Sequence, residues 1–169
     1  MTIESMRDLF EIGLRYTYDC EQQLVKKGLP GMIKGASSPE LKTALEQHLE
    51  ETRTHVTRLE KVFSELGVKA DTEDNDVVEE MISEAEGMIG DIDASPLRDA
   101  ALIVSGNQVE HYEMAVYGSL IAFAQKLGLG QAATVLQQTL QEEKAADAKL
   151  TQIGESAVNP RAAGEQKAA

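Results

Sequence analysis

The stretch from Leu97 to Lys126 reads LRDAALIVSGNQVEHYEMAVYGSLIAFAQK and is typical of one long helix. Residues three and four positions apart share one side of a helix. One such stripe consists of Ile103, Gly106, Glu110, Glu113, Tyr117, Leu120 and Ala124. Its two ends are apolar, but two carboxylates occupy its middle. Because a buried carboxylate is costly unless its charge is compensated, the stretch predicts a helical core that contains an acidic site.

Three further helices are predicted, over residues 3–34, 40–66 and 131–153. Each has an apolar stripe that polar residues interrupt near its middle. The interrupting residues are Glu21 in the first helix, His48 and His55 with Glu51 beside them in the second, and Glu143 and Asp147 in the fourth. If the four stripes face one another, these groups and the two carboxylates of residues 97–126 meet at one depth in the core.

Turn signals bound the predicted helices. Ser38–Pro39 supplies an N-cap with proline at the first helical position, and Gly67 supplies a glycine stop. Gly28–Pro30 predicts a kink or break in the first helix. Residues 155–169 lack periodicity, so we expect a disordered tail after a bundle domain of residues 1–154.

Residues 68–96 form a long connection with a shorter amphipathic helix, for which Asp76 is the expected cap. This helix is expected to pack across the outside or the end of the bundle. The connection is also expected to let the third long helix run antiparallel to the second. Two helical hairpins joined by one long link are typical of ferritin-like folds. The predicted fold is therefore all-α, a ferritin-like antiparallel four-helix bundle with an additional helix in the long crossover connection.

The composition agrees with a helical domain and excludes some functions. Hydrophobic residues make up 42% of the 169, and charged residues 27%, which indicates a globular chain. The net charge of -13 repels phosphate, so nucleic acid is not an expected partner. No apolar run is long enough to span a membrane, and no signal peptide is evident. The single cysteine, Cys20, cannot form an internal disulfide, and the expected location is the cytoplasm.

The carboxylates of the four stripes predict a two-metal site. They would repel one another strongly unless cations lay between them. Hard oxygen ligands with some imidazole suit iron or manganese better than copper or zinc. Di-iron bundles combine one Glu from each of two helices with Glu-x-x-His from the other two. This chain departs from that pattern, with Glu110-x-x-Glu113, Glu143-x-x-x-Asp147 and His48-x-x-Glu51.

Several runs resemble the YciE/YciF stress-protein family of the ferritin-like superfamily. They are HLEET at 48–52, VEHYE at 109–113, LQEEKAADAKLT at 140–151, DAALI at 99–103 and RLEKVF at 58–63. The resemblance covers the chain except its tail. It implies a four-helix core with an extra helix, a homodimer and a di-iron centre like that of rubrerythrin. It implies no defined reaction, since the family is associated with stress responses rather than with a substrate.

The resemblance also assigns roles to individual residues. The residues that it implies bind or bridge metal are Glu21, Glu51, Glu110, Glu113 and Glu143. It implies His48 and Asp147 as the terminal ligands, with His55 as a rival to His48. The missing Glu-x-x-His spacing is compatible with fewer ligands, an asymmetric site or the loss of one metal.

Other polar residues have simpler interpretations. His111 is expected at the surface or behind a metal ligand, Glu142 is expected in solvent, and Cys20 in the core. Tyr18 and Tyr117 are expected to pack, and either could hydrogen-bond a metal ligand. No Lys or Arg lies on the inner stripes, which weakens the alternative of buried ion pairs.

Three functions fit these observations. The protein could be a redox enzyme in which two iron or manganese ions react with oxygen or hydrogen peroxide. It could instead bind the metals without turnover. It could also be a structural stress protein with a partial site.

Overall fold

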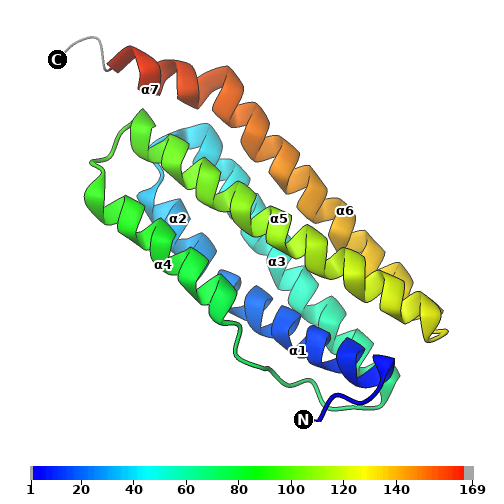
Figure 1. Ribbon diagram of the computed structural model, residues 1–169. Coiled ribbons are helices and arrows are strands. Elements are labelled where there is room, and N and C mark those ends of the chain that lie inside the picture. The colour runs from blue at the N-terminus through cyan, green and yellow to red at the C-terminus, as the bar shows by residue number, and fades with distance from the viewer. Residues whose placement is uncertain (1, 166–169) are drawn as a thin grey trace.

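The structure is a computed structural model that describes residues 2–165, and this range contains helices but no strand (Figure 1). Four long helices lie side by side along the molecule. They are α1 (Met6–Gln23), α3 (Pro39–Leu66), α5 (Pro96–Lys126) and α6 (Gly130–Ile153). A shorter helix, α4 (Asp76–Asp91), lies in the connection between α3 and α5. Two of the long helices are extended by the short segments η1 (Leu24–Gly28), α2 (Leu29–Gly35), η2 (Gly154–Val158) and α7 (Asn159–Glu165).

Polar side chains cap the N-termini of four helices. The hydroxyls of Ser5, Ser38 and Ser95 each accept a hydrogen bond from the N–H three residues later, which confirms Ser38 as a cap. Asn75 does the same for α4, so the expectation that Asp76 is the cap was wrong by one residue. Gly67 ends α3 with a φ of 72°, as the glycine stop predicts.

The first helix changes pitch where a kink or break was expected. Residues 24–28 form one π-helical turn, and α2 continues directly from it with Pro30 in its first turn. The wider turn accommodates the proline because its hydrogen bonds skip one residue more than those of an α-helix. A Cβ at Gly28 would lie 3.2 Å from Ile82, so the absence of a side chain there lets α4 approach closely.

The relative directions of the long helices differ from the expectation in one respect. Arg7 at the start of α1 donates a hydrogen bond to the carbonyl of Leu66 at the end of α3, so these helices are antiparallel. Asp99 at the start of α5 accepts hydrogen bonds from the N–H groups of Ser37 and Ser38 at the start of α3. Helices α3 and α5 are therefore parallel, not antiparallel (Figure 1). The reason is that α4 returns the chain along the molecule before α5 begins.

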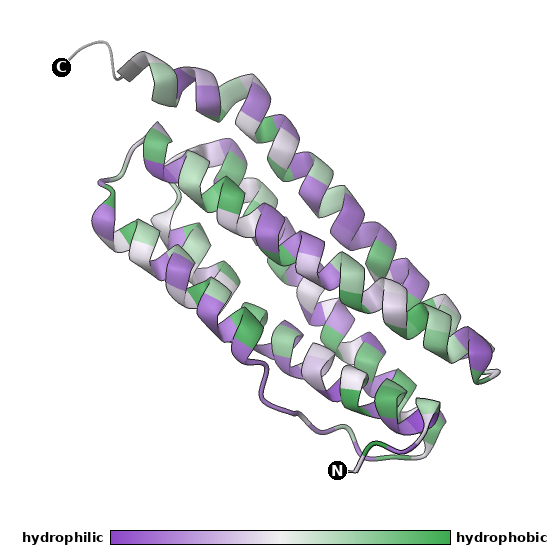
Figure 2. Ribbon diagram, viewed as in Figure 1, coloured by the Kyte–Doolittle hydropathy of each residue, from purple (hydrophilic) through white to green (hydrophobic). Residues whose placement is uncertain are grey.

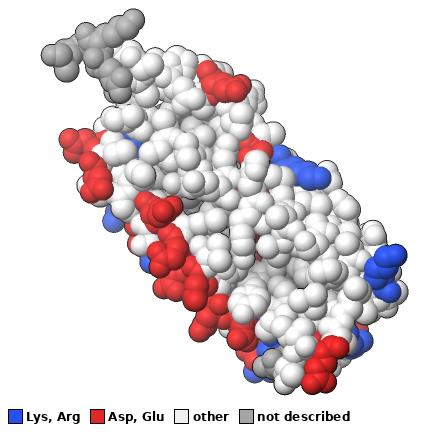
Figure 3. Space-filling model, in the orientation of Figure 1, with Lys and Arg blue, Asp and Glu red and all other residues white. Residues whose placement is uncertain are grey.

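The core consists of two apolar clusters separated by a polar layer. One cluster includes Leu45 and Ile103, and the other includes Leu59 and Tyr117. Hydrophobic and hydrophilic positions alternate along the helices, as amphipathic packing requires (Figure 2). Acidic side chains gather on the surface over α4, which carries no Lys or Arg (Figure 3).

The end of the chain also differs from expectation. A disordered tail was expected from residue 155, but residues 154–165 are helical. Val158 is 2% exposed and Ala162 is 8% exposed, and α7 packs against α5. These two apolar side chains give the segment a buried face, which the sequence analysis missed. The rest of the expected tail, residues 166–169, lies outside the described residues.

Candidate metal centre

The polar layer contains six acidic or imidazole side chains from all four long helices. They are Glu21 of α1, His48 and His55 of α3, Glu110 and Glu113 of α5, and Glu143 of α6, each at most 7% exposed. Those of α3, α5 and α6 come from the middle part of their helices, and Glu21 lies near the middle of the continuous segment that α1, η1 and α2 form. The local periodicity of the helices therefore brings them to one depth, as the sequence predicts.

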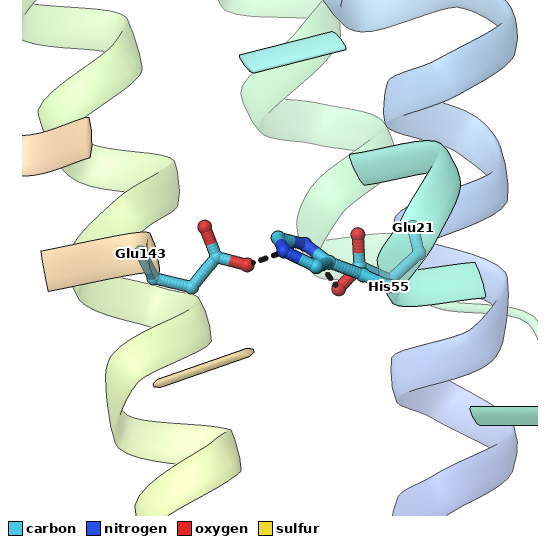
Figure 4. Close-up of side chains that lie close together, drawn as sticks. All are labelled: Glu21, His55 and Glu143. Atoms are coloured by element: carbon cyan, nitrogen blue, oxygen red, sulfur yellow. Dashed lines mark ion pairs between the residues drawn. The ribbon is translucent and has the colours of Figure 1, made fainter. Parts of the chain in front are cut away.

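Glu21, His55 and Glu143 form the first of two compact groups (Figure 4). Nδ1 of His55 lies 2.9 Å from Oε1 of Glu143 and 3.5 Å from Oε1 of Glu21. The hydroxyl of Tyr117 donates a hydrogen bond to the same oxygen of Glu21. Of the two tyrosines considered from the sequence, Tyr117 contacts this group, whereas Tyr18 donates to Glu60.

His48, Glu110 and Glu143 form the second group. Nε2 of His48 lies 3.1 Å from Oε1 of Glu110 and 3.7 Å from Oε2 of Glu143. Glu143 thus belongs to both groups, with one carboxylate oxygen toward each histidine. Within each group the possible ligand atoms all lie within 4.8 Å of one another, so one cation could contact all three.

Several buried oxygens in these groups have no hydrogen-bond partner among the described residues. They are Oε2 of Glu21, Oε2 of Glu110 and Oε2 of Glu143. Leaving a buried carboxylate oxygen without a hydrogen bond costs free energy, and the cost is larger for an ionised group. A bound cation would satisfy these lone pairs, and carboxylate with imidazole is a donor set that iron and manganese accept. The residues therefore fit a metal site.

The same crowding changes the protonation of the layer. Burial raises the pKa of Glu143 to about 8, and Glu21 adds to the rise while His55 opposes it. Burial also raises the pKa of Glu113 well above its ordinary value, with further repulsion from Glu21 and Glu143. Burial alone would lower the pKa of His55, but the carboxylates of Glu143 and Glu21 outweigh it and raise that pKa to about 11. Protons thus compensate the acids wherever cations do not.

Each histidine also has a carboxylate beside its other ring nitrogen. Nε2 of His55 lies 2.7 Å from Oε2 of Glu142, and Nδ1 of His48 lies 3.6 Å from Oε2 of Glu51. Arg58 holds Glu142 from the far side, donating to both of its carboxylate oxygens. Histidines that bind metals commonly have such an outer carboxylate, which fixes the ring and its tautomer.

Three of the seven predicted metal residues belong to neither group. Glu51 is partly exposed and accepts a hydrogen bond from Gln47. Asp147 is paired instead with the exposed ring of His111, at 3.2 Å from its Nε2. Glu113 is buried in the layer, with Sγ of Cys20 3.7 Å from its Oε1. The two groups contain the other four predicted residues, which are Glu21, His48, Glu110 and Glu143. The rival histidines are both used, with His55 in the first group and His48 in the second.

The sequence matches a known protein family over nearly all of its length. A family model described as a domain of unknown function, DUF892, matches residues 5–163. This chain belongs to the DUF892 family. The match spans all four long helices.

Several proteins resemble this DUF892 chain along most of their length. Protein YciF of Escherichia coli is 38% identical over 163 residues, which cover 96% of this chain and 98% of YciF. The crystal structure of that stress protein covers 93% of this chain and 99% of its own, with a TM-score of 0.88. YcfI, a suggested structural protein from Rhodopseudomonas palustris, is 42% identical over 88% of this chain and 94% of its own, with a TM-score of 0.85.

A third structure shows the likeness of fold alone. It is a protein from Xanthomonas campestris pathovar campestris, 22% identical, with a TM-score of 0.76 over 96% of this chain and 99% of its own. None of the helices in residues 2–165 of this DUF892 protein is both long and apolar enough to cross a membrane.

Glu142 is the residue of this DUF892 protein that sequence reasoning misjudged most clearly. It was expected in solvent, but it contacts His55 and Arg58. Arg58 follows His55 by three positions and so shares its side of α3, which was the available signal. Because Arg58 lies just beside the apolar stripe rather than on it, the stripe alone does not indicate this pair.

Proposed function

We propose that this DUF892 protein holds two iron ions, or two manganese ions, and acts in the stress response. The observation that carries the proposal is the position of Glu143, whose two oxygens face different His–Glu groups. A carboxylate in this position can bridge two cations. The similarity to the stress protein YciF supports the stress-response part of the proposal.

The fold is proposed to be a ferritin-like four-helix bundle. Helices α1 and α3 form one hairpin, α5 and α6 form the other, and the connection that contains α4 joins them. One long crossover is the connectivity of ferritin-like bundles. The parallel arrangement of α3 and α5 follows from a single crossover of this kind, since the chain returns to its starting end. The homodimer and the cytoplasmic location stay predictions.

The proposed ligands divide between two positions. Glu21 and His55 would hold one ion, His48 and Glu110 would hold the other, and Glu143 would contact both. Glu113 is an additional candidate because it is buried in the same layer and its pKa is raised by burial and by its acidic neighbours. Oxygen ligands with one imidazole for each ion suit iron and manganese.

Two ferrous ions would supply the two electrons that reduce one hydrogen peroxide, with two protons, to two waters. The chain's own residues prepare the site for such chemistry. The apolar clusters cover the layer on its two sides along the helices. The hydroxyl of Tyr117 orients Glu21, and the Arg58–Glu142 pair orients the ring of His55.

Metal binding without turnover, or a structural role, is the second candidate. Glu51, Glu113 and Asp147 lie outside the two groups, so the site departs from the predicted ligand set. The suggested structural role of the relative YcfI points the same way. Consumption of hydrogen peroxide by the iron-loaded protein distinguishes the candidates, because a binding or structural protein would leave peroxide unchanged.

Elemental analysis tests the proposal directly. The untagged chain is loaded anaerobically with ferrous iron, desalted and analysed for iron and protein. We expect two iron ions in each chain and loss of most of both in Glu143→Gln, which keeps the shape but removes the charge. Glu50→Gln is the matched control, since Glu50 is exposed on α3 and touches neither group.

Two results would contradict the proposal. One is a wild-type protein that retains no iron or manganese. The other is a folded Glu143→Gln variant that retains as much metal as the wild type.

A further inference from the structure

The two groups of the candidate centre differ in their access to solvent. A cavity of about 90 Å³ lies between α3 and α6 and is lined by His48 and Glu110. Its other walls include the exposed residues Gln47, Ala145 and Lys149. The cavity therefore leads from the surface to the second group. Neither His55 nor Glu21 lines it, and both are 0% exposed.

Small side chains create this cavity. Ala44 of α3 and Ala145 and Ala146 of α6 line it, where longer side chains would fill the space between two packed helices. Further along the same pair of helices, Leu59 and Leu136 are buried and belong to the continuous apolar cluster. The cavity beside His48 therefore lies where small side chains replace the large apolar ones of that cluster.

Within the described residues, the first group has no such opening beside its histidine. Nε2 of His55 already contacts Glu142, which Arg58 holds in place. Tyr117 is 0% exposed, and its hydroxyl donates a hydrogen bond to Glu21. The buried tyrosine therefore covers this carboxylate. On this side, a ligand from solvent would have to displace the Arg58–Glu142 pair to reach His55.

We propose that the His48–Glu110 position exchanges ligands with solvent through this cavity, while the Glu21–His55 position does not. The inference rests on the proposed function, because it assigns the access route of that centre. The volume admits molecules of a few heavy atoms. The ligand class is therefore a small neutral molecule or anion of two or three heavy atoms, with hydrogen peroxide and azide as examples.

Azide binding to the iron-loaded, air-oxidised protein tests the route. Azide is titrated while the absorption of the ferric centre is followed, and the iron content of each sample is measured separately. Ala146→Leu places a larger side chain in the cavity and should weaken azide binding about tenfold or more, equivalent to at least about 1.4 kcal/mol. Both ions should remain, since Ala146 provides no metal ligand.

Two further variants complete the design. Ala148→Leu is the matched control, because Ala148 is an exposed residue of the same helix that does not line the cavity. It should bind azide as the wild type does. Ala44→Leu fills the cavity from the opposite wall and replaces Ala146→Leu if that variant does not fold.

Failure of the access route can be distinguished from failure of the proposed function. A filled variant that keeps both ions and binds azide with unchanged affinity overturns the access route alone. A wild-type protein that keeps both ions but binds no azide also overturns it. A wild-type protein that takes up no iron overturns the proposed function and this inference together.

Discussion

Glu142 of α6 and His55 of α3 are joined at 2.7 Å between Oε2 and Nε2, and this contact leaves Nδ1 of His55 directed at Glu21 and Glu143. The ring is thus oriented by a carboxylate that is not itself in either group. Arg58 completes the arrangement by holding both oxygens of Glu142.

Glu142→Ala is expected to weaken the binding of one of the two ions about 10- to 100-fold, which is typical of removing an outer carboxylate from a histidine ligand. Competition with a chelator of known affinity measures the effect. Glu142→Gln should recover part of the loss because it retains an acceptor for the imidazole N–H. Equal metal affinity in the wild type and Glu142→Ala would show that Glu142 does not position His55.

Asp147→Asn is expected to leave the metal content unchanged, although the sequence predicts Asp147 as a ligand. Its carboxylate lies beside the exposed ring of His111 and belongs to neither group. Elemental analysis of this variant beside Glu110→Gln gives the comparison, since Glu110 belongs to the second group. Loss of metal in Asp147→Asn would restore the sequence-based assignment.

Tyr117→Phe is expected to lower the free energy of unfolding of the metal-free protein by about 1–3 kcal/mol, because the buried Glu21 loses its hydrogen-bond donor. Urea denaturation in the presence of a chelator measures this loss. Tyr18→Phe is the control, because the hydrogen bond from Tyr18 to Glu60 is exposed to solvent. Similar small losses in both variants would contradict a special role for Tyr117.

The metal-free protein is expected to lose stability as the pH rises. Folding raises the pKa of Glu143 from its ordinary 4.5 to about 8. The contribution of this group to the free energy of unfolding therefore falls as the pH rises from 4.5 to about 8. Folding raises the pKa of His55 from 6.5 to about 11, so the contribution of His55 to the free energy of unfolding also falls as the pH rises through that range. The two effects have the same sign, because in both cases the folded state binds the extra proton.

Urea denaturation at about pH 6 and about pH 9 measures this dependence. Bound metal replaces the protons, so the loaded protein should show a smaller change than the metal-free protein. Replacing Glu143 by Gln removes one titrating group and should reduce the fall. A metal-free protein that is equally stable at both pH values would contradict the proposed protonation of the layer.

Local sequence patterns predict the four long helices and the depth of the acidic layer, but not the helical segment at residues 154–165. Both are local properties, because a helix repeats every 3.6 residues and its caps are read from adjacent residues. Glu21, Glu110 and Glu143 stand out for this reason, each being a charge between apolar neighbours on one stripe. Ser38 and Gly67 mark the limits of α3 for the same reason.

The tertiary structure alone decided which side chains at the edge of a stripe face the interior. An apolar stripe is about 100° wide, and the rotation of each helix depends on how it packs against its neighbours. This is why Glu142 turns toward His55 while Asp147 turns toward His111. The parallel run of α3 and α5 was likewise set by the path of α4, which packing rather than local sequence determines.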